Sequence, residues 1–416
     1  MMVFYFYGCY NNFMKTNRKY PKVIINKKAE KRQEKKHPWV YDNEIISYDV
    51  YENGEIVDVI GENGKYYGSG FINENSVIRV RIISRNANDT FDEAFYERRL
   101  RHAVNYRKTV MKDDYSCCRI IFGEADMFSG LTVDRFSNIL VAEVNSLGID
   151  KIKDFLFNKL VEIMNEEGQE IVGLYERNES NLRVKEGLEQ YTGYYPLKNM
   201  EIPSFTSTTI VENGIEYEVD FGNGQKTGFF LDQKYNRLAV SKLAKDMRVL
   251  DCFTHTGSFG LNAAKGGAKK VVSVDISKSA IETAKRNAAR NELDIEYVVA
   301  DGFDYLEDMK KNEFDFIILD PPAFTKSKKT VHNAYDGYKR INFLAMKKLP
   351  RGGYLATASC SHYMENYLFV RMLKEAAQEA NVELRLIEER RQACDHPIVW
   401  NIPETEYLKF YIFQIC

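Results

Sequence analysis

The sequence predicts an α/β protein whose C-terminal part forms a doubly wound, mostly parallel sheet, preceded by a small β-rich unit and an α+β unit. From Met247 onward, apolar strand-like runs alternate strictly with helical patterns, as in folds built from successive strand–helix–strand units. These apolar runs are nearly continuous, which is typical of strands that are buried on both faces. Ahead of Met247 the runs are shorter and do not alternate in this regular way.

The composition is that of an ordinary globular protein. The 416 residues are 44% hydrophobic and 28% charged, and this length predicts several domains rather than one. No apolar run reaches the roughly 18 residues that cross a membrane, and the N-terminal residues lack the pattern of a signal peptide. The seven cysteines show no C-x-x-C or zinc-ligand spacing, so we expect reduced thiols, no metal, no membrane partner and a cytoplasmic location.

Shifts in pattern divide the chain into four segments. They are an N-terminal extension at 1–20, a β-rich domain at 21–95, an α+β domain at 96–195 and the α/β domain at 196–416. In the β-rich domain, residues 55–60 and 76–83 are rich in β-branched side chains, and Asn-Gly pairs on both sides of 55–60 favour hairpin turns. Residues 91–111 have the apolar spacing of a helix, and a hairpin is expected at 210–221.

The α/β domain is predicted element by element. Parallel strands are expected at 248–253, 270–276, 295–302, 314–322 and 352–360, with helical patterns between them. The clearest helix is 277–293, where Ala280, Ala284 and Ala288 share one face and a Ser-x-x-Glu pattern favours the helix start. The final apolar run, 406–415, is expected to form an antiparallel edge strand.

Charge is distributed unevenly along the chain. Ten basic residues and two acidic ones lie between Lys15 and Val40, so this segment carries +8 and the rest of the chain −10, within a net charge of −2. A basic segment on an acidic body favours a nucleic acid partner. The alternative is an ordinary solvated charge run.

Polar residues end all five predicted parallel strands. In order, these ends are Asp251 to Gly257, Asp275, Asp301, Asp320 and Cys360. A single aspartate at such a position is often only a helix cap, but ligands of open α/β sheets bind at the carboxyl ends of strands, so five polar ends in register favour a shared crevice. A dinucleotide site would need G-x-G-x-x-G, and Phe253 and His255 stand where two of those glycines belong.

This series of strand ends resembles the class I S-adenosylmethionine-dependent methyltransferases, which implies S-adenosylmethionine as cofactor. The first loop is then implied to bend round the methionine part, the second strand end to bind the ribose and the third to lie beside the adenine. The residues concerned are Phe253, Thr254, Thr256, Gly257, Asp275, Ile276, Asp301, Gly302 and Asp320. Pro321 and Pro322 make the next segment rigid, because proline fixes φ and removes a donor, and with Phe324 they are expected to contact the substrate base.

Seven segments in matching order carry a closer resemblance, to the bacterial 23S ribosomal RNA cytosine-5 methyltransferases. They are HPWVYDNEI (37–45), GEADMFSGLTVDRFSN (123–138), QKTGFFLDQKYNR (225–237), LDCFTHTGSFG (250–260), DPPAFTKSK (320–328), GYKRIN (337–342) and SCSHY (359–363). The resemblance implies a PUA RNA-binding domain at 21–95, RNA (here 23S ribosomal RNA) as partner, and rRNA processing as the role. It also implies that Lys226, Thr227, Gly228, Phe230, Leu231 and Asp232 wrap the cofactor from the opposite side. The oligomeric state is left open, with a homodimer as one alternative.

Methylation of cytosine carbon 5 gives two residues a chemical role. Carbon 5 is a poor nucleophile, and a thiolate that adds to carbon 6 makes it a good one. We therefore expect Cys360 to be the nucleophile and Asp320 the acid near ring nitrogen 3, because their strands are neighbours in a sheet of this topology. His362, two residues further on, would lie on the same face if the strand continues and would lower the pKa of the thiol. The competing interpretation of Cys360 is a buried core residue.

Two other functions stay open. An RNA guanine or adenine N-methyltransferase would use the same cofactor crevice without needing Cys360. A non-catalytic RNA-binding protein would keep the N-terminal domain but would have no use for five polar strand ends. The nucleoside that the protein modifies distinguishes among the three functions.

Overall fold

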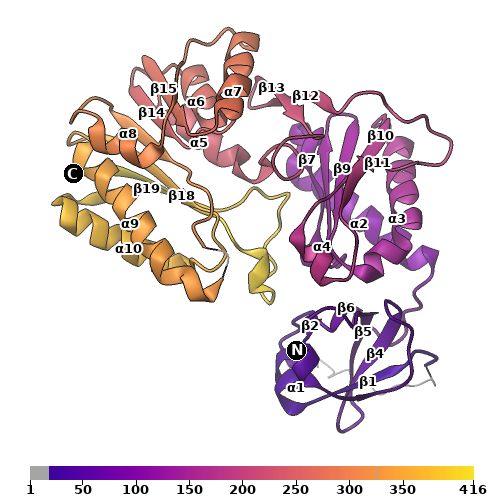
Figure 1. The fold of residues 1–416 in the computed structure, drawn as a ribbon. Coiled ribbons are helices and arrows are strands. Elements are labelled where there is room, and N and C mark those ends of the chain that lie inside the picture. The colour runs from indigo at the N-terminus through magenta and orange to yellow at the C-terminus, as the bar shows by residue number, and fades with distance from the viewer. Residues whose placement is uncertain (1–17, 326) are drawn as a thin grey trace, which may run out of the picture. The chain divides into compact units, whose positions relative to one another are not determined.

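The structure is a computed structural model that describes residues 18–325 and 327–416. Its contacts group the chain into two compact units (Figure 1). The first unit runs up to residue 112 and includes 119–204 and 399–403, and the second holds 113–118, 205–398 and 404–416. The predicted N-terminal extension lies, as far as residue 17, outside the described residues. No helix of the described ranges is long and apolar enough to span a bilayer.

The first unit begins with a β-rich sheet. Within the described residues this sheet has six strands in the order β2-β6-β5-β4-β1-β3. The strands are β1 (Lys22–Ile25), β2 (Trp39–Val40), β3 (Ile45–Tyr48), β4 (Ile56–Gly61), β5 (Tyr66–Ile72) and β6 (Val80–Ser84), with helix α1 (Lys27–Glu34) after β1. The side chain of Asn26 caps α1 by accepting a hydrogen bond from the Ala29 amide at 3.0 Å. Because α1 buries Ala29 and Gln33 against the sheet, its lysines face solvent.

The α+β part of the same unit follows. The helix predicted at 91–111 is α2 (Glu93–Met111), which starts at the cap Asp92 and buries Phe95, Leu100 and Val104. In the described residues its sheet has the order β11-β10-β9-β8-β7. The elements are β7 (Cys117–Phe122), β8 (Leu131–Phe136), β9 (Ile139–Val144), α3 (Leu147–Glu166), β10 (Gly173–Asn178), α4 (Asn181–Lys185) and β11 (Tyr191–Tyr194).

The second unit holds the predicted doubly wound sheet, with the strand order β16-β15-β14-β17-β18-β20-β19. A hairpin, β12 (Ser207–Glu212) with β13 (Ile215–Asp220), precedes it as predicted. The strands of the sheet are β14 (Arg248–Cys252), β15 (Lys270–Asp275), β16 (Glu296–Val299), β17 (Phe316–Leu319), β18 (Tyr354–Ser359), β19 (Leu384–Arg390) and β20 (Lys409–Ile415). The helices are α5 (Lys234–Leu243), α6 (Ser258–Lys265), α7 (Lys278–Arg290), α8 (Gly302–Asp308), α9 (Val331–Lys348) and α10 (Asn366–Ala380).

Helices cover both faces of this sheet, which confirms the predicted fold class. Successive residues of β17 alternate between two cores: Ile317 and Leu319 pack with residues of α8, α9 and α10, and Phe316 and Ile318 pack with residues of α5 and α6. Figure 1 shows α8, α9 and α10 beside β18 and β19. Burial on both faces explains why the strand sequences are continuously apolar.

Two details of the α/β prediction were wrong. The run 406–415 does form an antiparallel strand, β20, but it lies between β18 and β19 rather than at the edge. All but one of the residues of β20 are buried, whereas β19 carries four charged residues and buries none of its side chains fully, as an edge strand tolerates. Helix α7 is capped by Ser277, whose hydroxyl accepts from the Ala280 amide at 3.3 Å, and not by the serine of the Ser-x-x-Glu pattern.

Candidate active site

The carboxyl ends of five parallel strands, β16, β15, β14, β17 and β18, lie at one edge of the sheet and carry the predicted residues Asp275, Asp301, Asp320 and Cys360. Cys252, the last residue of β14, lies opposite both Val274 and Leu319, and Leu319 lies opposite Thr357 of β18. Asp320 therefore follows β17 directly, and Cys360 follows the neighbouring β18. The expectation that these two residues come from adjacent strands is confirmed.

The loop after β14 has an unusual backbone. Phe253, His255 and Gly257 all have positive φ, at 65°, 51° and 88°, which is uncommon for residues other than glycine. The His255 amide donates to Oδ2 of Asp275 at 2.8 Å, so the loop is tied to the end of the next strand. Such a strained, fixed turn is typical of a ligand-binding loop.

Asp251 holds this loop from inside the sheet. Its Oδ2 accepts hydrogen bonds from the Thr254 hydroxyl and, at 2.8 Å, from the Gly260 amide, and burial raises its pKa to about 7. Among the described residues, Oδ1 of Asp251 and the hydroxyl of Thr256 are buried without a hydrogen-bond partner. These two polar atoms fit a bound cofactor with an amine and a carboxylate, because buried polar groups need partners. Asp251 was noted in the sequence only as a strand end.

Asp275 and two apolar neighbours form the second part of the crevice. The Asp275 carboxylate accepts from the His255 amide and, at 2.8 Å, from the Ser277 amide, which leaves acceptor capacity for a ribose hydroxyl pair. Ile276 is 70% exposed, and Val299, opposite Asp275 in the β15–β16 pairing, is 52% exposed. Sequence analysis missed Val299, although its position before Asp301 at the end of an apolar strand was a usable signal.

Asp301 and Gly302 have structural partners of their own. Oδ1 of Asp301 caps α8 by accepting from the Phe303 and Asp304 amides at 2.8 and 3.4 Å, as strand-end aspartates often do. A Cβ on Gly302 would lie 2.8 Å from the Phe253 ring. Gly302 therefore allows the Phe253 loop to pack closely on the start of α8.

The segment Lys226–Asp232 lies against the same loop. The Phe230 ring meets the His255 ring edge-on at 5.3 Å, and the Lys226 ammonium stands 4.4 Å from the Phe230 ring centre. Arg237, which is buried and paired with Glu212 at 2.7 Å, donates to the Phe230 carbonyl. The structure therefore brings this segment to the cofactor loop and fixes its backbone with a buried cation.

The remaining residues of the segment are mostly buried. Thr227, Leu231 and Asp232 are each at most 5% exposed. Gly228 has φ 127°, and a Cβ there would lie 2.7 Å from Val219, so a side chain is excluded. Asp232 accepts a hydrogen bond from the Tyr407 hydroxyl at 2.5 Å.

In the Asp-Pro-Pro segment and the residues after it, Asp320 has a polar partner and Phe324 has an aromatic one. Burial raises the pKa of Asp320 to about 7, and the Asp232 carboxylate contributes to this rise. Oδ1 of Asp320 accepts from the Gln233 side-chain amide at 3.0 Å. The Phe324 ring packs on Tyr338 at 4.5 Å. Pro321 is buried and Pro322 is exposed.

Cys360 lies in an electrostatically mixed environment. Burial raises the pKa of its thiol to about 11, the Asp320 carboxylate adds to this, and the ammonium groups of Lys226 and Lys409 oppose it. The expectation for His362 was wrong, because β18 ends at Ser359 and the strand alternation does not continue to residue 362. His362 is exposed, and its ring contacts Tyr363 at 5.3 Å.

Lys409 is a neighbour of Cys360 that was not predicted from the sequence. It lies opposite Ser359 in the β18–β20 pairing, is 4% exposed, and donates to the carbonyls of Ser361 and Tyr407, both at 2.7 Å. Burial lowers its pKa to about 8. A lysine inside the otherwise apolar run 406–415 was the available signal.

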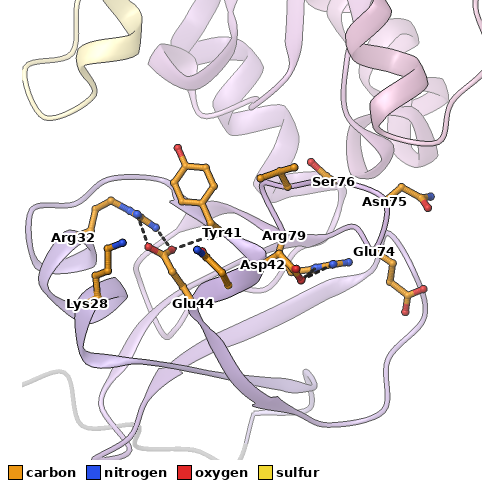
Figure 2. A pocket seen from close by; sticks show the side chains of 11 residues that line it. Lys28, Arg32, Tyr41, Asp42, Glu44, Glu74, Asn75, Ser76 and Arg79 are labelled. Atoms are coloured by element: carbon orange, nitrogen blue, oxygen red, sulfur yellow. Dashed lines mark hydrogen bonds and ion pairs between the residues drawn. The ribbon is translucent and has the colours of Figure 1, made fainter. Parts of the chain in front are cut away.

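The first unit contains a separate polar pocket of about 600 Å³ beside α1 (Figure 2). Arg32 pairs with Glu44 and Arg79 pairs with Asp42, in each case with a nitrogen–oxygen distance of 2.6 Å, as the dashed lines in Figure 2 mark. Lys28 also lines the pocket. Both arginines are thus paired with acids, whereas Lys28 is exposed and no ion pair involving it is found among the described residues.

Two family models match the chain. Residues 198–410 match S-adenosylmethionine-dependent methyltransferases, and residues 23–85 match a PUA-like domain. These ranges cover the sheet edge described above and the β-rich sheet with α1. They leave the α+β part of the first unit between them.

Curated relatives extend the match over nearly the whole chain. The ribosomal RNA large subunit methyltransferase I of Aliivibrio fischeri (strain MJ11) is 38% identical over 400 residues, which are 94% of this chain and 99% of that protein. The protein of the same name from Photobacterium profundum is 40% identical over 395 residues, 93% of this chain and 97% of that one.

The solved structures agree in fold. A protein described as a methyltransferase and crystallised with SAH superposes with a TM-score of 0.78 at 20% identity, covering 94% of this chain and 99% of its own. A SAM-dependent methyltransferase from Streptococcus mutans gives 0.77 at 19% identity, with the same coverage. The sequence identity to the relatives and the match over 198–410 show that this chain belongs to the S-adenosylmethionine-dependent methyltransferase family and carries a PUA-like domain ahead of its catalytic fold.

Proposed function

We propose that this protein methylates carbon 5 of a cytosine in 23S ribosomal RNA through a covalent bond between Cys360 and the base. The ribosomal RNA large subunit substrate is supported by the names of relatives that match over 94% of the chain. The choice of carbon 5 rests on one observation, the juxtaposition of a thiol and a proton-holding carboxyl on adjacent strand ends, Cys360 and Asp320. A nitrogen of guanine or adenine would need no thiol.

Cys360 supplies the nucleophile in this mechanism. Its thiol loses a proton to solvent, the thiolate bonds to cytosine carbon 6, and the electrons of the carbon 5–carbon 6 double bond move toward ring nitrogen 3. The Lys409 ammonium, held by the Ser361 carbonyl, and the Lys226 ammonium both favour the thiolate. Because the pKa of the thiol is raised to about 11, these two cations are needed to increase the fraction of Cys360 that is present as thiolate.

Asp320 supplies the proton that ring nitrogen 3 takes up. With a pKa raised to about 7, its carboxyl is protonated in about half of the molecules at neutral pH, so an acid is available where an ordinary aspartate would be ionised. After the methyl group has moved from the cofactor sulfur to carbon 5, carbon 5 loses its proton to solvent, the electrons of the carbon–sulfur bond return to the Cys360 sulfur, and nitrogen 3 returns its proton to Asp320. Cys360 is then regenerated.

The cofactor crevice is formed by the loop 253–257, Asp275 and the segment 226–232. S-adenosylmethionine supplies the methyl group, which is electrophilic because its sulfur is a sulfonium. In our proposal Asp275 binds the ribose hydroxyls and Ile276 contacts the adenine ring. Thr254, Thr256 and Gly257 enclose the methionine part, and Lys226 to Asp232 cover it from the other side.

The exposed lysines of α1 would bind RNA phosphates. Lys27 and Lys31 of α1 and Lys35, the residue that caps its C-terminal end, are exposed, and no ion pair involving them is found among the described residues. Phosphate contacts hold an RNA without reading its sequence, so this surface would dock the substrate and leave the choice of base to the catalytic unit. Phe324 would stack on a flipped-out cytosine.

The direct test is to identify the modified nucleoside. An in-vitro transcript of 23S ribosomal RNA is incubated with the full-length protein and labelled S-adenosylmethionine, digested to nucleosides and analysed by mass spectrometry. We expect labelled 5-methylcytidine. Labelled N-methylguanosine or N-methyladenosine would transfer the proposal to the N-methyltransferase alternative, and the absence of any labelled nucleoside would contradict RNA methylation of this substrate.

A further inference from the structure

A chain of three hydrogen bonds runs from the edge strand to the candidate catalytic acid. The Nε of Arg390 donates to Oδ1 of Asn236 at 3.2 Å. The Nδ2 of Asn236 donates to Oε1 of Gln233 at 2.6 Å, and the Nε2 of Gln233 donates to Oδ1 of Asp320 at 3.0 Å. Asn236 and Gln233 are 1% and 4% exposed, so water does not compete at these atoms.

The direction of every bond in this chain is fixed by its first member. A guanidinium can only donate, so the atom of Asn236 that meets Arg390 is its oxygen. The Asn236 amide nitrogen then donates to Gln233, whose oxygen must accept, and the Gln233 nitrogen is left facing Asp320. The order of donors and acceptors therefore follows from the chemistry of these side chains alone.

We propose that Gln233 and Asn236 are positioning residues that keep a donor on Oδ1 of Asp320, so that the proton of this acid sits on Oδ2 and points at the substrate base. A carbonyl oxygen accepts a hydrogen bond better than a hydroxyl oxygen does, so a donor at Oδ1 favours the form protonated at Oδ2. This inference rests on the proposed role of Asp320 as the acid at ring nitrogen 3. It gives a function to Gln233, which lies in the segment QKTGFFLDQKYNR, and to Asn236.

Several charged groups around Asp320 affect its pKa, which can be tested by titration. The carboxylates of Asp232 and Asp251 disfavour its ionised form, whereas Arg237 and Lys226 favour it, and the thiol of Cys360, whose pKa is raised to about 11, is uncharged where Asp320 titrates. The Gln233 amide also favours the ionised form by donating to it. Loss of this donor must therefore move the titration of Asp320 upward, whatever the effect on catalysis.

Three variants of the full-length protein separate donor direction from charge. Gln233→Leu removes the donor. Asn236→Asp keeps the acceptor for Arg390 but cannot donate, so the Gln233 amide turns and offers its oxygen to Asp320. Asn236→Leu breaks the chain without adding charge. Cofactor affinity, measured by calorimetry, should stay within about threefold of wild type in all three, because none of these side chains belongs to the proposed cofactor crevice.

The first readout is the titration of Asp320 itself, followed by carboxyl-¹³C NMR of aspartate-labelled protein and assigned with Asp320→Asn. We expect the midpoint to rise by about one pH unit in Gln233→Leu and in Asn236→Asp. If the titration midpoint of Asp320 did not move in Gln233→Leu, the proposed chain of hydrogen bonds would be overturned, whichever nucleoside the wild-type protein produces. This result tests the hydrogen bonds to Asp320 separately from the proposed function, which is tested by the nucleoside that is methylated.

The second readout is single-turnover methyl transfer. We expect a loss of about 10- to 100-fold in the rate at saturating RNA, with little change in the RNA concentration at half-saturation, in all three variants. The loss should occur even though Asp320 holds its proton more tightly, because that proton no longer points at the base. Wild-type rates in Asn236→Leu would overturn the positioning role and leave the chain as packing only.

Discussion

Charged side chains in the N-terminal PUA-like domain and at the sheet edge of the second unit are arranged in opposite ways. In the PUA-like domain, buried acids meet bases: Asp58 pairs with Arg18 at 2.7 Å and Glu44 pairs with Arg32. At the sheet edge, acids lie near other acids, and Asp320 has the carboxylate of Asp232 as a neighbour that opposes its ionisation. The first arrangement pairs each acid with an arginine, whereas the second places Asp320 between a carboxylate that opposes its ionisation and two cations, Arg237 and Lys226, that favour it.

In the proposed function, this difference separates the binding of RNA from proton transfer to the base. A carboxylate that is paired with an arginine stays ionised and takes no part in proton transfer at neutral pH. A carboxyl that is buried beside another carboxyl holds its proton up to neutral pH and is able to give it to a base. The exposed lysines of α1 need only long-range attraction for phosphates. A variant at the sheet edge should therefore change the rate of methyl transfer, and a variant on α1 should change affinity.

The largest effect is expected from Cys360→Ala. Without the sulfur there is no covalent step, so the rate of methyl transfer should fall by about 10³-fold or more. Binding of RNA and of S-adenosylmethionine, measured by filter binding and calorimetry, should be nearly unchanged. The matched control is Cys252→Ala, which removes a buried thiol from the end of β14, a strand that β17 separates from β18, and should lower thermal stability while keeping the rate. Equal rates in the two variants would return Cys360 to a packing role.

The next effect concerns pH. Below about pH 7 both Asp320 and Cys360 hold their protons, because their pKa values are raised to about 7 and about 11. The reactive pair must lose one proton, so the rate should rise about tenfold per pH unit up to pH 7 and then level off. Asp320→Asn removes the group that gives up this proton. Its rate should be about 10²- to 10³-fold lower, and its rise should continue toward the pKa of the thiol.

A single-turnover pH profile measures both parts of this prediction. If Asp320→Asn kept the wild-type acid limb near pH 7, another group would control it and Asp320 would not be the acid.

A smaller effect is expected from Asp275→Ala, which should weaken S-adenosylmethionine binding by about 10- to 100-fold. Each lost hydrogen bond to a charged acceptor is worth about 1.5–3 kcal/mol, and the variant also frees the His255 amide that ties the loop 253–257 to β15. Titration calorimetry checks the affinity. Asp294→Ala, at an exposed acid of the same unit, is the control and should bind normally. Wild-type affinity in Asp275→Ala would remove this residue from the ribose site.

The smallest effect is expected from variants of the exposed lysines at α1, which are proposed to bind RNA phosphates. Changing Lys27, Lys31 and Lys35 to glutamine should weaken RNA binding by about tenfold or less and reduce its salt dependence, because fewer counterions are released. The rate at saturating RNA should not change. The control removes the same charge from three lysines of the second unit, Lys242, Lys310 and Lys311. Identical salt slopes in the two triple variants would show that α1 is not the phosphate-binding surface.

Sequence periodicity predicted the parts of this fold that depend on local pattern. The parallel strands are continuously apolar because helices cover both faces, and their polar ends meet at one edge because the strands are parallel. The position of β20 was missed because both edge and interior strands of a sheet fit an apolar run, and only its pairing with β18 and β19 decides between them.

The electrostatics of the site were not predictable from local pattern. Lys409 reaches the Ser361 carbonyl from a strand 48 residues away, and Gln233 reaches Asp320 across 87 residues. His362 was expected to be the partner of Cys360 because it is near in sequence, yet the strand ends one residue before the cysteine. Proximity in the chain was a poor guide to the neighbours of a side chain at the end of a strand.

The covalent step between Cys360 and cytosine carbon 6 has one direct test. A 23S ribosomal RNA transcript made with 5-fluorocytidine in place of cytidine is incubated with S-adenosylmethionine and the full-length protein, then run on a denaturing gel. Fluorine on carbon 5 cannot leave as a proton does, so the bond between Cys360 and carbon 6 should persist as a protein–RNA adduct. We predict this adduct for the wild-type protein and for Cys252→Ala, and none for Cys360→Ala. A wild-type protein that methylates the unmodified transcript but forms no adduct with the fluorinated one would contradict the covalent mechanism.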